Sequence, residues 1–244
     1  MKSEEYKKLG DIEQQHWFYK GKRAIVRGWI KRFVHLKPTD LWVDVGCGTG
    51  IFVEELSKEC RSYGIEPSPE GIELYLRSNR SRNLVAGSIL SLPVQSQTVD
   101  IATSLDVFEH IKDDRQAISE IIRVVRKGGL IVIMVPAFQW VMSDWDVALG
   151  HYRRYNFRDF DELLRDQPVM VLHKSYINSL MFLPIVCYRL FRKIFRLDKI
   201  KRLEDIIPSA VINQILYYIF VGSAMIKWPR MPIGLSVFLI LKRE

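Results

Sequence analysis

The stretch VDVGCGTG, residues 43–50, decides the fold class of this chain because it joins a short apolar run to a glycine-rich turn. Its glycines allow a tight turn whose backbone can approach a ligand closely, as in the first loop of a Rossmann-type sheet. The apolar run 41–45 predicts a buried strand, and residues 51–60 predict a helix. The stretch therefore predicts a strand, a ligand-binding turn and a helix in succession.

The same alternation continues along the chain. Short apolar runs are followed by stretches with helical spacing, which indicates βαβ units and a parallel sheet. The sequence thus predicts an α/β fold: a Rossmann-like, mostly parallel seven-stranded sheet with helices on both faces and a helical insertion before the last strand. The predicted strands are 41–45, 61–66, 83–87, 99–105, 130–136, 169–177 and 233–243, and the predicted helices between them include 51–60, 69–78 and 113–126.

Three segments depart from this alternation. Residues 21–36 have helical periodicity and predict an amphipathic leading helix. After Pro136 about twenty residues lack a regular pattern, until Asn156 caps a predicted helix over 157–165. We divide the chain into an N-terminal lid with the leading helix, a cofactor-binding core, a helical insertion and the last strand of the core, which are residues 1–37, 38–177, 178–231 and 232–244.

Three kinds of ligand can be weighed for the glycine turn. A dinucleotide site requires a third glycine where this chain has Ile51, and the charge of Asp44 would repel a pyrophosphate. A phosphate-binding P-loop requires a Gly-Lys-Ser/Thr sequence, which the turn lacks. An amine suits Asp44, and Glu66, 22 residues further on, can accept hydrogen bonds from two ribose hydroxyls. Together these features describe S-adenosylmethionine.

With its neighbouring motifs the turn resembles the class I S-adenosylmethionine-dependent methyltransferases, over about residues 39–136. The motifs are DVGCGTG 44–50, GIEPS 64–68, GSILSLPV 87–94, SLDVFEHI 104–111 and RVVRKGGLIVIMVP 123–136. The resemblance implies a cofactor that leaves as S-adenosyl-L-homocysteine. It places the methionine part at the glycine turn, the ribose at Glu66, the adenine at 88–89 and the sulfonium beside 106–107.

The chain departs from the family pattern at Ser88, where many members carry Asp, so the hydrogen bond to the adenine amino group is the least supported part of the resemblance. Cys47 is interpreted as a small residue in a tight turn and not as a nucleophile. The cofactor-binding residues that the resemblance implies are Asp44, Gly46, Cys47, Gly48, Gly50, Glu66, Pro67, Ser88, Ile89, Asp106 and Val107.

The irregular segment after Pro136 is expected to overhang the crevice at the carboxyl ends of the strands, where ligands of α/β sheets bind. Its PAF…DVALGHYRRY pattern resembles a subgroup of class I methyltransferases often found beside glycan and polyprenyl-phosphate glycosylation enzymes. Methyl transfer to a hydroxyl or amine gains from a nearby base. The catalytic candidates are His151, His110 and Asp146, and the substrate-binding candidates are His16, Tyr152, Arg153, Arg154 and Tyr155.

The two adjacent arginines are expected to point different ways. One would face the crevice and clamp a phosphate or carboxylate, for which the guanidinium fork is suited. The other would pair with a structural carboxylate such as Asp159 or Asp161. His16 begins a segment that in the resembling family often folds over the cofactor as a lid, although ordinary packing of the leading helix explains it equally well.

The formal net charge of +8 has a local excess in residues 182–204, which points to an anionic partner. Residues 182–199 predict a basic amphipathic helix of the kind that lies in a membrane interface. Residues 209–226 are apolar all round and too short to span a bilayer. The insertion is therefore expected to contact a membrane peripherally, to form a homodimer interface, or to cap the catalytic domain with its second half packed on its first helix.

Three cysteines without metal-ligand spacing predict neither disulfides nor a metal site, and the charged N-terminus predicts no secretory signal. We expect a cytoplasmic enzyme, with the inner membrane face as the alternative location. The main hypothesis is a methyltransferase, most simply an O-methyltransferase, of a small-molecule or lipid-linked anionic acceptor at the membrane surface. The alternatives are an RNA- or DNA-directed methyltransferase or nucleic-acid-binding module, disfavoured by LDVF at 105–108 in place of an NPP(Y/F) loop, and a non-catalytic scaffold that binds the cofactor.

Overall fold

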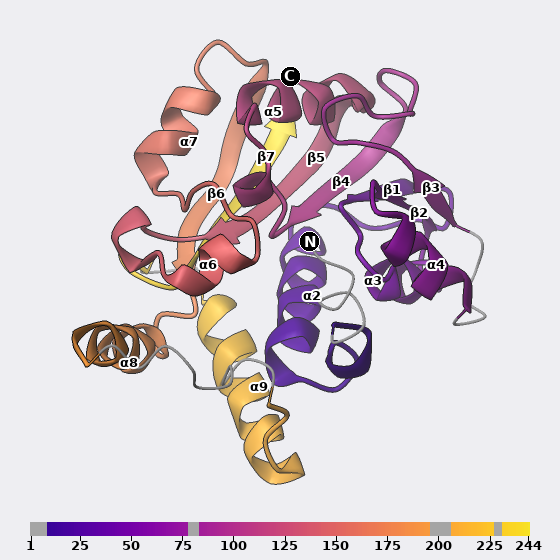
Figure 1. Cartoon of the computed structure of the whole chain (residues 1–244). Coiled ribbons are helices and arrows are strands. Elements are labelled where there is room, and N and C mark those ends of the chain that lie inside the picture. Colours follow the sequence, from indigo (N-terminus) through magenta and orange to yellow (C-terminus); the bar gives the residue numbers. More distant parts are fainter. Residues whose placement is uncertain (1–8, 78–82, 196–205, 227–230) are drawn as a thin grey trace.

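The computed structural model of the chain describes residues 9–77, 83–195, 206–226 and 231–244. Its strands form one seven-stranded sheet in the order β3-β2-β1-β4-β5-β7-β6 (Figure 1). The predicted Rossmann-like fold is thereby confirmed. The strands are β1 (Leu41–Val45), β2 (Arg61–Glu66), β3 (Leu84–Ala86), β4 (Val99–Leu105), β5 (Val125–Pro136), β6 (Val169–Ile177) and β7 (Ser236–Arg243).

The sheet is parallel except at one strand. β1 pairs in parallel with β2 and β4, and the pairs β2–β3 and β4–β5 are parallel as well. β7 runs antiparallel to both of its neighbours, β5 and β6. Because the chain builds outward from β1 in both directions, a topological switch point lies between β1 and β4, where α/β sheets bind ligands at the carboxyl ends of the strands.

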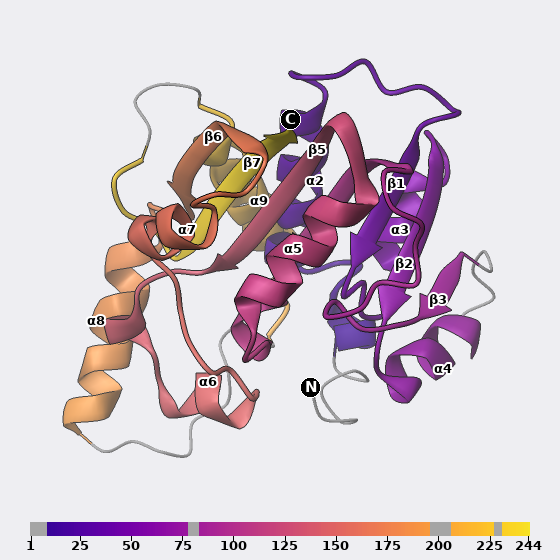
Figure 2. The same ribbon diagram turned by 90° about the horizontal axis from the view of Figure 1, so that it is seen from above.

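Helices cover both faces of the sheet (Figures 1 and 2). α5 (Asp114–Val124) and α7 (Phe157–Leu163) bury their apolar sides in the core on one face, with Ile118 and Phe160 fully buried. α2 (Trp17–Ile30), α3 (Ile51–Leu56) and α9 (Ala210–Ala224) pack in the core on the other face. The remaining helical elements are α4 (Pro69–Arg77), η1 (Phe108–His110), η2 (Gln139–Val141), α6 (Asp144–Ala148) and α8 (Phe182–Ile194).

Element boundaries differ from the predicted ones where a cap or a strand intervenes. α2 begins before residue 21 because His16 caps it, with Nδ1 accepting a hydrogen bond from the Phe18 N–H. β5 starts at Val125 and not at 130, because the chain passes directly from the end of α5 into the strand. The predicted cap at Asn156 is confirmed, since its side chain accepts hydrogen bonds from the first turn of α7.

The two helices of the insertion pack on different parts of the molecule. α9 lies along α2, where Phe220 and Ala224 are buried and the Trp29 indole donates a 2.9 Å hydrogen bond to the Ala224 carbonyl. α8 instead buries Phe182 and Val186 with Val141, beside the irregular segment. Of the alternatives for the insertion, the packing of the apolar helix on the first helix of the insertion is therefore wrong, because α9 buries its apolar side chains against α2.

Candidate active site

The glycine turn at the end of β1 is as tight as its sequence predicts. Gly46, Gly48 and Gly50 all have positive φ, at 77°, 58° and 74°. A Cβ added to Gly46 would overlap the side chain of Val107, and one added to Gly50 would overlap the ring of Tyr75. The turn therefore needs glycine for two independent reasons, the left-handed backbone and the close approach of neighbouring side chains.

We expect Gly50→Ala to destabilise the protein more than Gly150→Ala. Both positions have positive φ, which costs an alanine roughly 1–3 kcal/mol, but a Cβ at Gly150 would meet no atom within 4 Å. The overlap with Tyr75 adds to the strain at Gly50 alone. Urea denaturation should show a larger loss of unfolding free energy for Gly50→Ala, by about 1 kcal/mol or more. Equal losses would contradict the role of Tyr75.

Asp44 lies in β1 beside the turn and is 5% exposed. It pairs across the sheet with Thr103 of β4, whose hydroxyl donates a 2.6 Å hydrogen bond to Oδ1. Burial raises the pKa of Asp44 to about 6, against the opposing effect of the Thr103 hydroxyl. Nearby Glu66 raises it further, whereas Arg23 and Lys22 lower it. A buried carboxyl of this kind is poised to ionise when a cation arrives.

Glu66 ends β2 and is 2% exposed. Its Oε2 accepts a hydrogen bond from the Gly48 N–H at 2.8 Å, and its Oε1 accepts one from the Ser68 N–H at 3.0 Å. Each carboxylate oxygen has further lone pairs for a diol. The side chain therefore connects the glycine turn to the beginning of α4, which places the two predicted halves of the cofactor site in direct contact.

The other predicted cofactor residues differ in burial and in their contacts. Burial and the carboxylates of Asp44 and Glu66 raise the pKa of the Cys47 thiol well above its usual value, which argues against a nucleophile. Asp106 has a positive φ of 55° and forms an ion pair with Lys22 of α2. Val107 contacts Gly46, Ile89 is buried, and Ser88 and Pro67 are exposed.

The structure brings the three catalytic candidates together. The rings of His110 and His151 meet edge to face with centroids 4.6 Å apart, and His151 Nδ1 lies 3.2 Å from Asp146 Oδ1. Burial, reinforced by His151, lowers the pKa of His110 to about 4, so that its ring is neutral near pH 7. Burial would raise the pKa of Asp146, but His151 and Arg154 hold it well below its usual range.

Arg153 and Arg154 each form an ion pair with a carboxylate that the sequence did not predict. Arg154 is buried and donates to Asp146 Oδ1 from Nη2 at 2.5 Å. Arg153 donates to Asp114 at 2.7 Å and also to the Lys112 carbonyl. The expected partners are therefore wrong: Asp159 completes the cap of α7 and Asp161 pairs with Lys174. The reason is chain direction, because the segment turns back over η1 before α7 begins.

Of the remaining acceptor-side candidates, only Tyr152 is strongly exposed, at 51%. Tyr155 is buried and its hydroxyl donates to the Phe108 carbonyl and to Asp114. Burial raises the pKa of Tyr155 far above its usual value, so this hydroxyl does not act as a base near neutral pH. His16 is buried as the cap of α2.

Three residues of the site were not among the sequence candidates: Lys22, Thr103 and Glu109. Lys22 also lies over the rings of Phe18 and Tyr19, which holds the leading helix beside Asp106. Glu109 is fully buried in η1, and burial, together with the charge of Asp106, raises its pKa well above the usual value. Residues of these types are common in any sequence, and only the fold shows that Thr103 pairs with Asp44 and that Lys22 pairs with Asp106.

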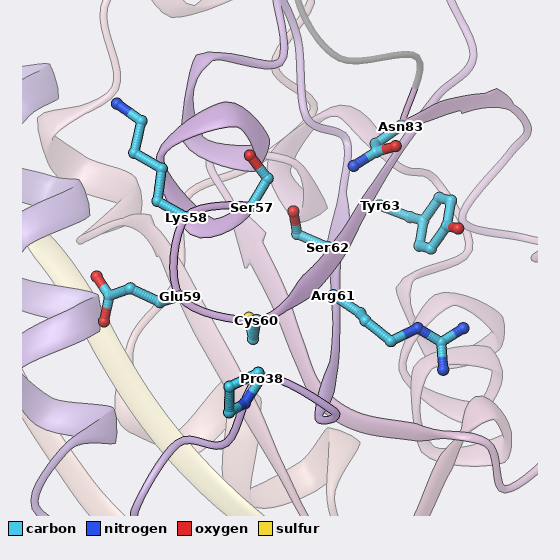
Figure 3. Close-up of a pocket in the computed structure, with 9 residues that line it drawn as sticks. All are labelled: Pro38, Ser57, Lys58, Glu59, Cys60, Arg61, Ser62, Tyr63 and Asn83. Carbon is cyan, nitrogen blue, oxygen red and sulfur yellow. The ribbon is translucent and has the colours of Figure 1, made fainter.

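A separate hollow of about 380 Å³ lies at the other end of the strands from the glycine turn (Figure 3). It is lined by residues between α3 and β2, including Lys58 and Arg61, whose side chains point in different directions. Arg61 is the first residue of β2, so this hollow is at the amino ends of the strands. It is not the crevice that the switch point predicts.

Comparison with known proteins agrees with this geometry. Residues 43–133 match a family model described as a methyltransferase domain. An uncharacterized methyltransferase of Mycobacterium sp. (strain JLS) is 31% identical over 111 residues, which cover 45% of this chain and 44% of that protein. The chain spans less than half of the length of the curated relatives that it matches first, 39% and 44%.

Two solved structures share the fold across most of the chain. One is a Haloferax volcanii protein solved in a complex with a methyltransferase activator, with 17% identity, a TM-score of 0.61 and coverage of 99% of this chain and 93% of that one. The other is a geranyl diphosphate methyltransferase in complex with S-adenosylmethionine, with 14% identity, a TM-score of 0.61 and coverage of 90% and 85%. Among the described residues, no helix is long and apolar enough to cross a membrane.

Proposed function

We propose that this chain, whose residues 43–133 match a family model described as a methyltransferase domain, transfers a methyl group from S-adenosylmethionine to an acceptor held between η1 and the 146–155 segment. The observation that carries the proposal is the contact of Glu66 with the glycine turn beside buried Asp44, at the switch point of the sheet. A carboxyl for an amine and a second one for a diol, joined by a glycine-rich turn, suit this cofactor.

In this proposal Asp44 binds the amino group of the methionine part and Glu66 binds the ribose. Asp106 and Val107 line the sulfonium side, and residues 88–89 border the adenine. Transfer from a sulfonium is an in-line displacement in which the donor charge disappears, so positioning supplies much of the rate. The ring of His151 faces Asp146. In this proposal it takes up the proton that the hydroxyl or amine of the methyl acceptor loses.

The binding of S-adenosyl-L-homocysteine should weaken as the pH falls through about 6, the raised pKa of Asp44. Only the ionised carboxylate attracts the ammonium group of the ligand, and one pH unit below this pKa about a tenth of the carboxyl is ionised. The Kd should therefore rise roughly tenfold from pH 7 to pH 5. Calorimetric titration at fixed ionic strength measures it, and no binding at pH 7.5 would reject the cofactor proposal itself.

The groups that face Asp44 set the sign of this effect. The Thr103 hydroxyl, Arg23 and Lys22 favour the ionised form, whereas burial and Glu66 oppose it. In Asp44→Asn no carboxyl titrates at this position, so the remaining binding should lose most of its pH dependence between 5 and 7. A variant that keeps the wild-type pH profile would show that another group is responsible.

For the acceptor we propose a lipid-linked anionic molecule at a membrane surface. α8 exposes apolar side chains and connects directly to the acceptor side, because Arg189 donates to the Val141 carbonyl and lies 3.6 Å from Asp146. Trp140 is 59% exposed beside Phe182. The sequence that follows Arg189 is rich in lysine and arginine. The exposed apolar residues of the two insertion helices and the residue after α8 are Leu183, Leu190, Phe191, Phe195, Val211, Ile212, Ile215, Tyr218 and Ile219.

Flotation with phosphatidylglycerol vesicles tests the membrane contact. The wild type should float, and the combined variant Phe191→Glu, Val211→Glu, Ile215→Glu should lose most of its flotation, because buried apolar area and anionic lipid both contribute to binding. Leu76→Glu on α4 is the matched control: Leu76 is 59% exposed, within the range of the three substituted residues, and the variant should float like the wild type. Deleting the insertion is unsuitable, since α9 covers α2.

Two outcomes would contradict this part of the proposal. Equal flotation of the triple variant and the wild type would show that the apolar faces do not bind lipid. Alternatively, light scattering could show a dimer that the triple variant converts to a monomer, with no flotation of either. The exposed faces would then be a homodimer interface.

A further inference from the structure

The side chain of Glu109 is buried, and no other described side chain pairs with its carboxyl group. The residue is 0% exposed, and neither Oε1 nor Oε2 has a hydrogen-bond partner among the described residues. The neighbouring carboxylates differ in this respect, because Asp106 pairs with Lys22 and Asp146 pairs with Arg154. A buried carboxyl oxygen without a hydrogen bond is costly, so a group that completes the site is expected.

The imidazole rings of His110 and His151 lie close to this carboxyl group. One ligand atom from each of Glu109, His110 and His151 can be chosen so that all three lie within 4.8 Å of one another. Ligands around a tetrahedral zinc at about 2.1 Å are roughly 3.4 Å apart, so no pair has to close by more than about 1.4 Å. Rotation of side chains can supply this movement without a change of the backbone.

The surroundings of the three side chains also suit metal ligands. The backbone carbonyl of Glu109 accepts a hydrogen bond from the Tyr152 N–H at 2.7 Å. This bond holds η1 against the segment that carries His151. His151 Nδ1 faces Asp146 at 3.2 Å, which leaves Nε2 for a metal. His110 is hydrogen-bonded to the backbone of Gly150. Ligating histidines are commonly oriented in this way by a carboxylate or a carbonyl.

We propose that Glu109, His110 and His151 bind one divalent transition-metal ion, with zinc as the best match to two imidazoles and a carboxylate. Three protein ligands leave a coordination position open for an oxygen atom of another molecule. If the proposed function holds, that oxygen belongs to the acceptor, and the ion lowers the pKa of its hydroxyl so that the proton leaves to solvent; with the ion bound, His151 acts as a metal ligand and does not itself accept the proton. The metal site itself does not depend on methyl transfer.

Calorimetric titration of the chelator-treated, tag-free full chain with ZnCl₂ tests the site without cofactor or acceptor. All proteins carry Cys187→Ser, because Cys187 is an exposed thiol that could bind zinc. We expect one zinc per chain, and Glu109→Gln and His151→Ala should each raise the Kd at least about tenfold. His35→Ala removes an exposed imidazole outside the cluster and should leave the Kd unchanged.

The outcomes separate this proposal from the proposed function. Absence of saturable zinc binding, or binding that Glu109→Gln and His151→Ala leave unchanged, would overturn the metal site. S-adenosyl-L-homocysteine affinity is measured on the same proteins, and retention of that affinity by Glu109→Gln shows that the variant is folded. Because His151→Ala removes a mostly buried ring, Glu109→Gln, which keeps the shape of the side chain, decides the question if the alanine variant does not fold.

Discussion

Asp44→Asn should weaken the binding of S-adenosyl-L-homocysteine by roughly 30-fold or more at pH 7.5. The substitution keeps the size of the side chain and an oxygen that can accept the Thr103 hydrogen bond, so the sheet is preserved. It removes the negative charge that would face the ammonium group of the ligand. Losing one member of a buried charge pair costs about 2–5 kcal/mol of binding free energy. Isothermal titration calorimetry measures the loss directly.

The matched control is Asp40→Asn, at the amino end of the same strand. Asp40 accepts a hydrogen bond from the Lys37 N–H in a surface turn, away from the carboxyl-end crevice. Its substitution should cost about 1 kcal/mol of stability or less and leave the Kd within about twofold of the wild type. If Asp44→Asn binds as tightly as Asp40→Asn, the amino group of the cofactor is held elsewhere.

His151→Ala should lower methyl transfer at least about 100-fold while the affinity for S-adenosyl-L-homocysteine stays nearly unchanged. The ring packs against His110 and Asp146, and neither contact involves Asp44 or Glu66. Removal of a positioned proton acceptor typically costs a factor of about 10²–10⁴. The measurement is transfer of labelled methyl groups from S-adenosylmethionine to a total bacterial lipid extract, beside a calorimetric titration of the same protein.

His35→Ala is the control for the loss of an imidazole as such, since His35 is exposed after the leading helix. His151→Gln keeps a polar side chain that can reach Asp146 and provides the test if the alanine variant fails to fold. Transfer by His151→Gln and His151→Ala at wild-type rates would show that the acceptor is activated by another group. A parallel loss of cofactor affinity and of thermal stability would instead assign His151 a structural role.

The cofactor side was largely predictable because its signals are local in sequence. The positive φ values of the glycines belong to a five-residue turn, and periodicity places that turn after β1. Glu66 could be placed because the end of β2 follows from the same alternation. The role of Thr103 could not be predicted, because Thr103 lies beside Asp44 only through the register of β1 with β4.

The contacts around His151 could not be predicted from local sequence signals. His110 and His151 were candidates separately, but their edge-to-face contact depends on how the 146–155 segment folds back over η1. Glu109 has no distinguishing pattern in the sequence, and its isolation follows from burial alone. The arginine partners were wrong for the same reason, because spacing along the chain does not say which distant carboxylate will be buried beside a guanidinium.

The sequence by itself determined the α/β architecture, the glycine turn and the acidic residues beside it, because backbone sterics and the periodicity of apolar residues act over a few positions. Only the tertiary structure decided that α9 covers α2, that Lys22 meets Asp106, and that Glu109 and His110 lie close to His151. These contacts join residues far apart in the chain. Their formation depends on which apolar surfaces bury each other, a property of the assembled fold that no short stretch of sequence contains.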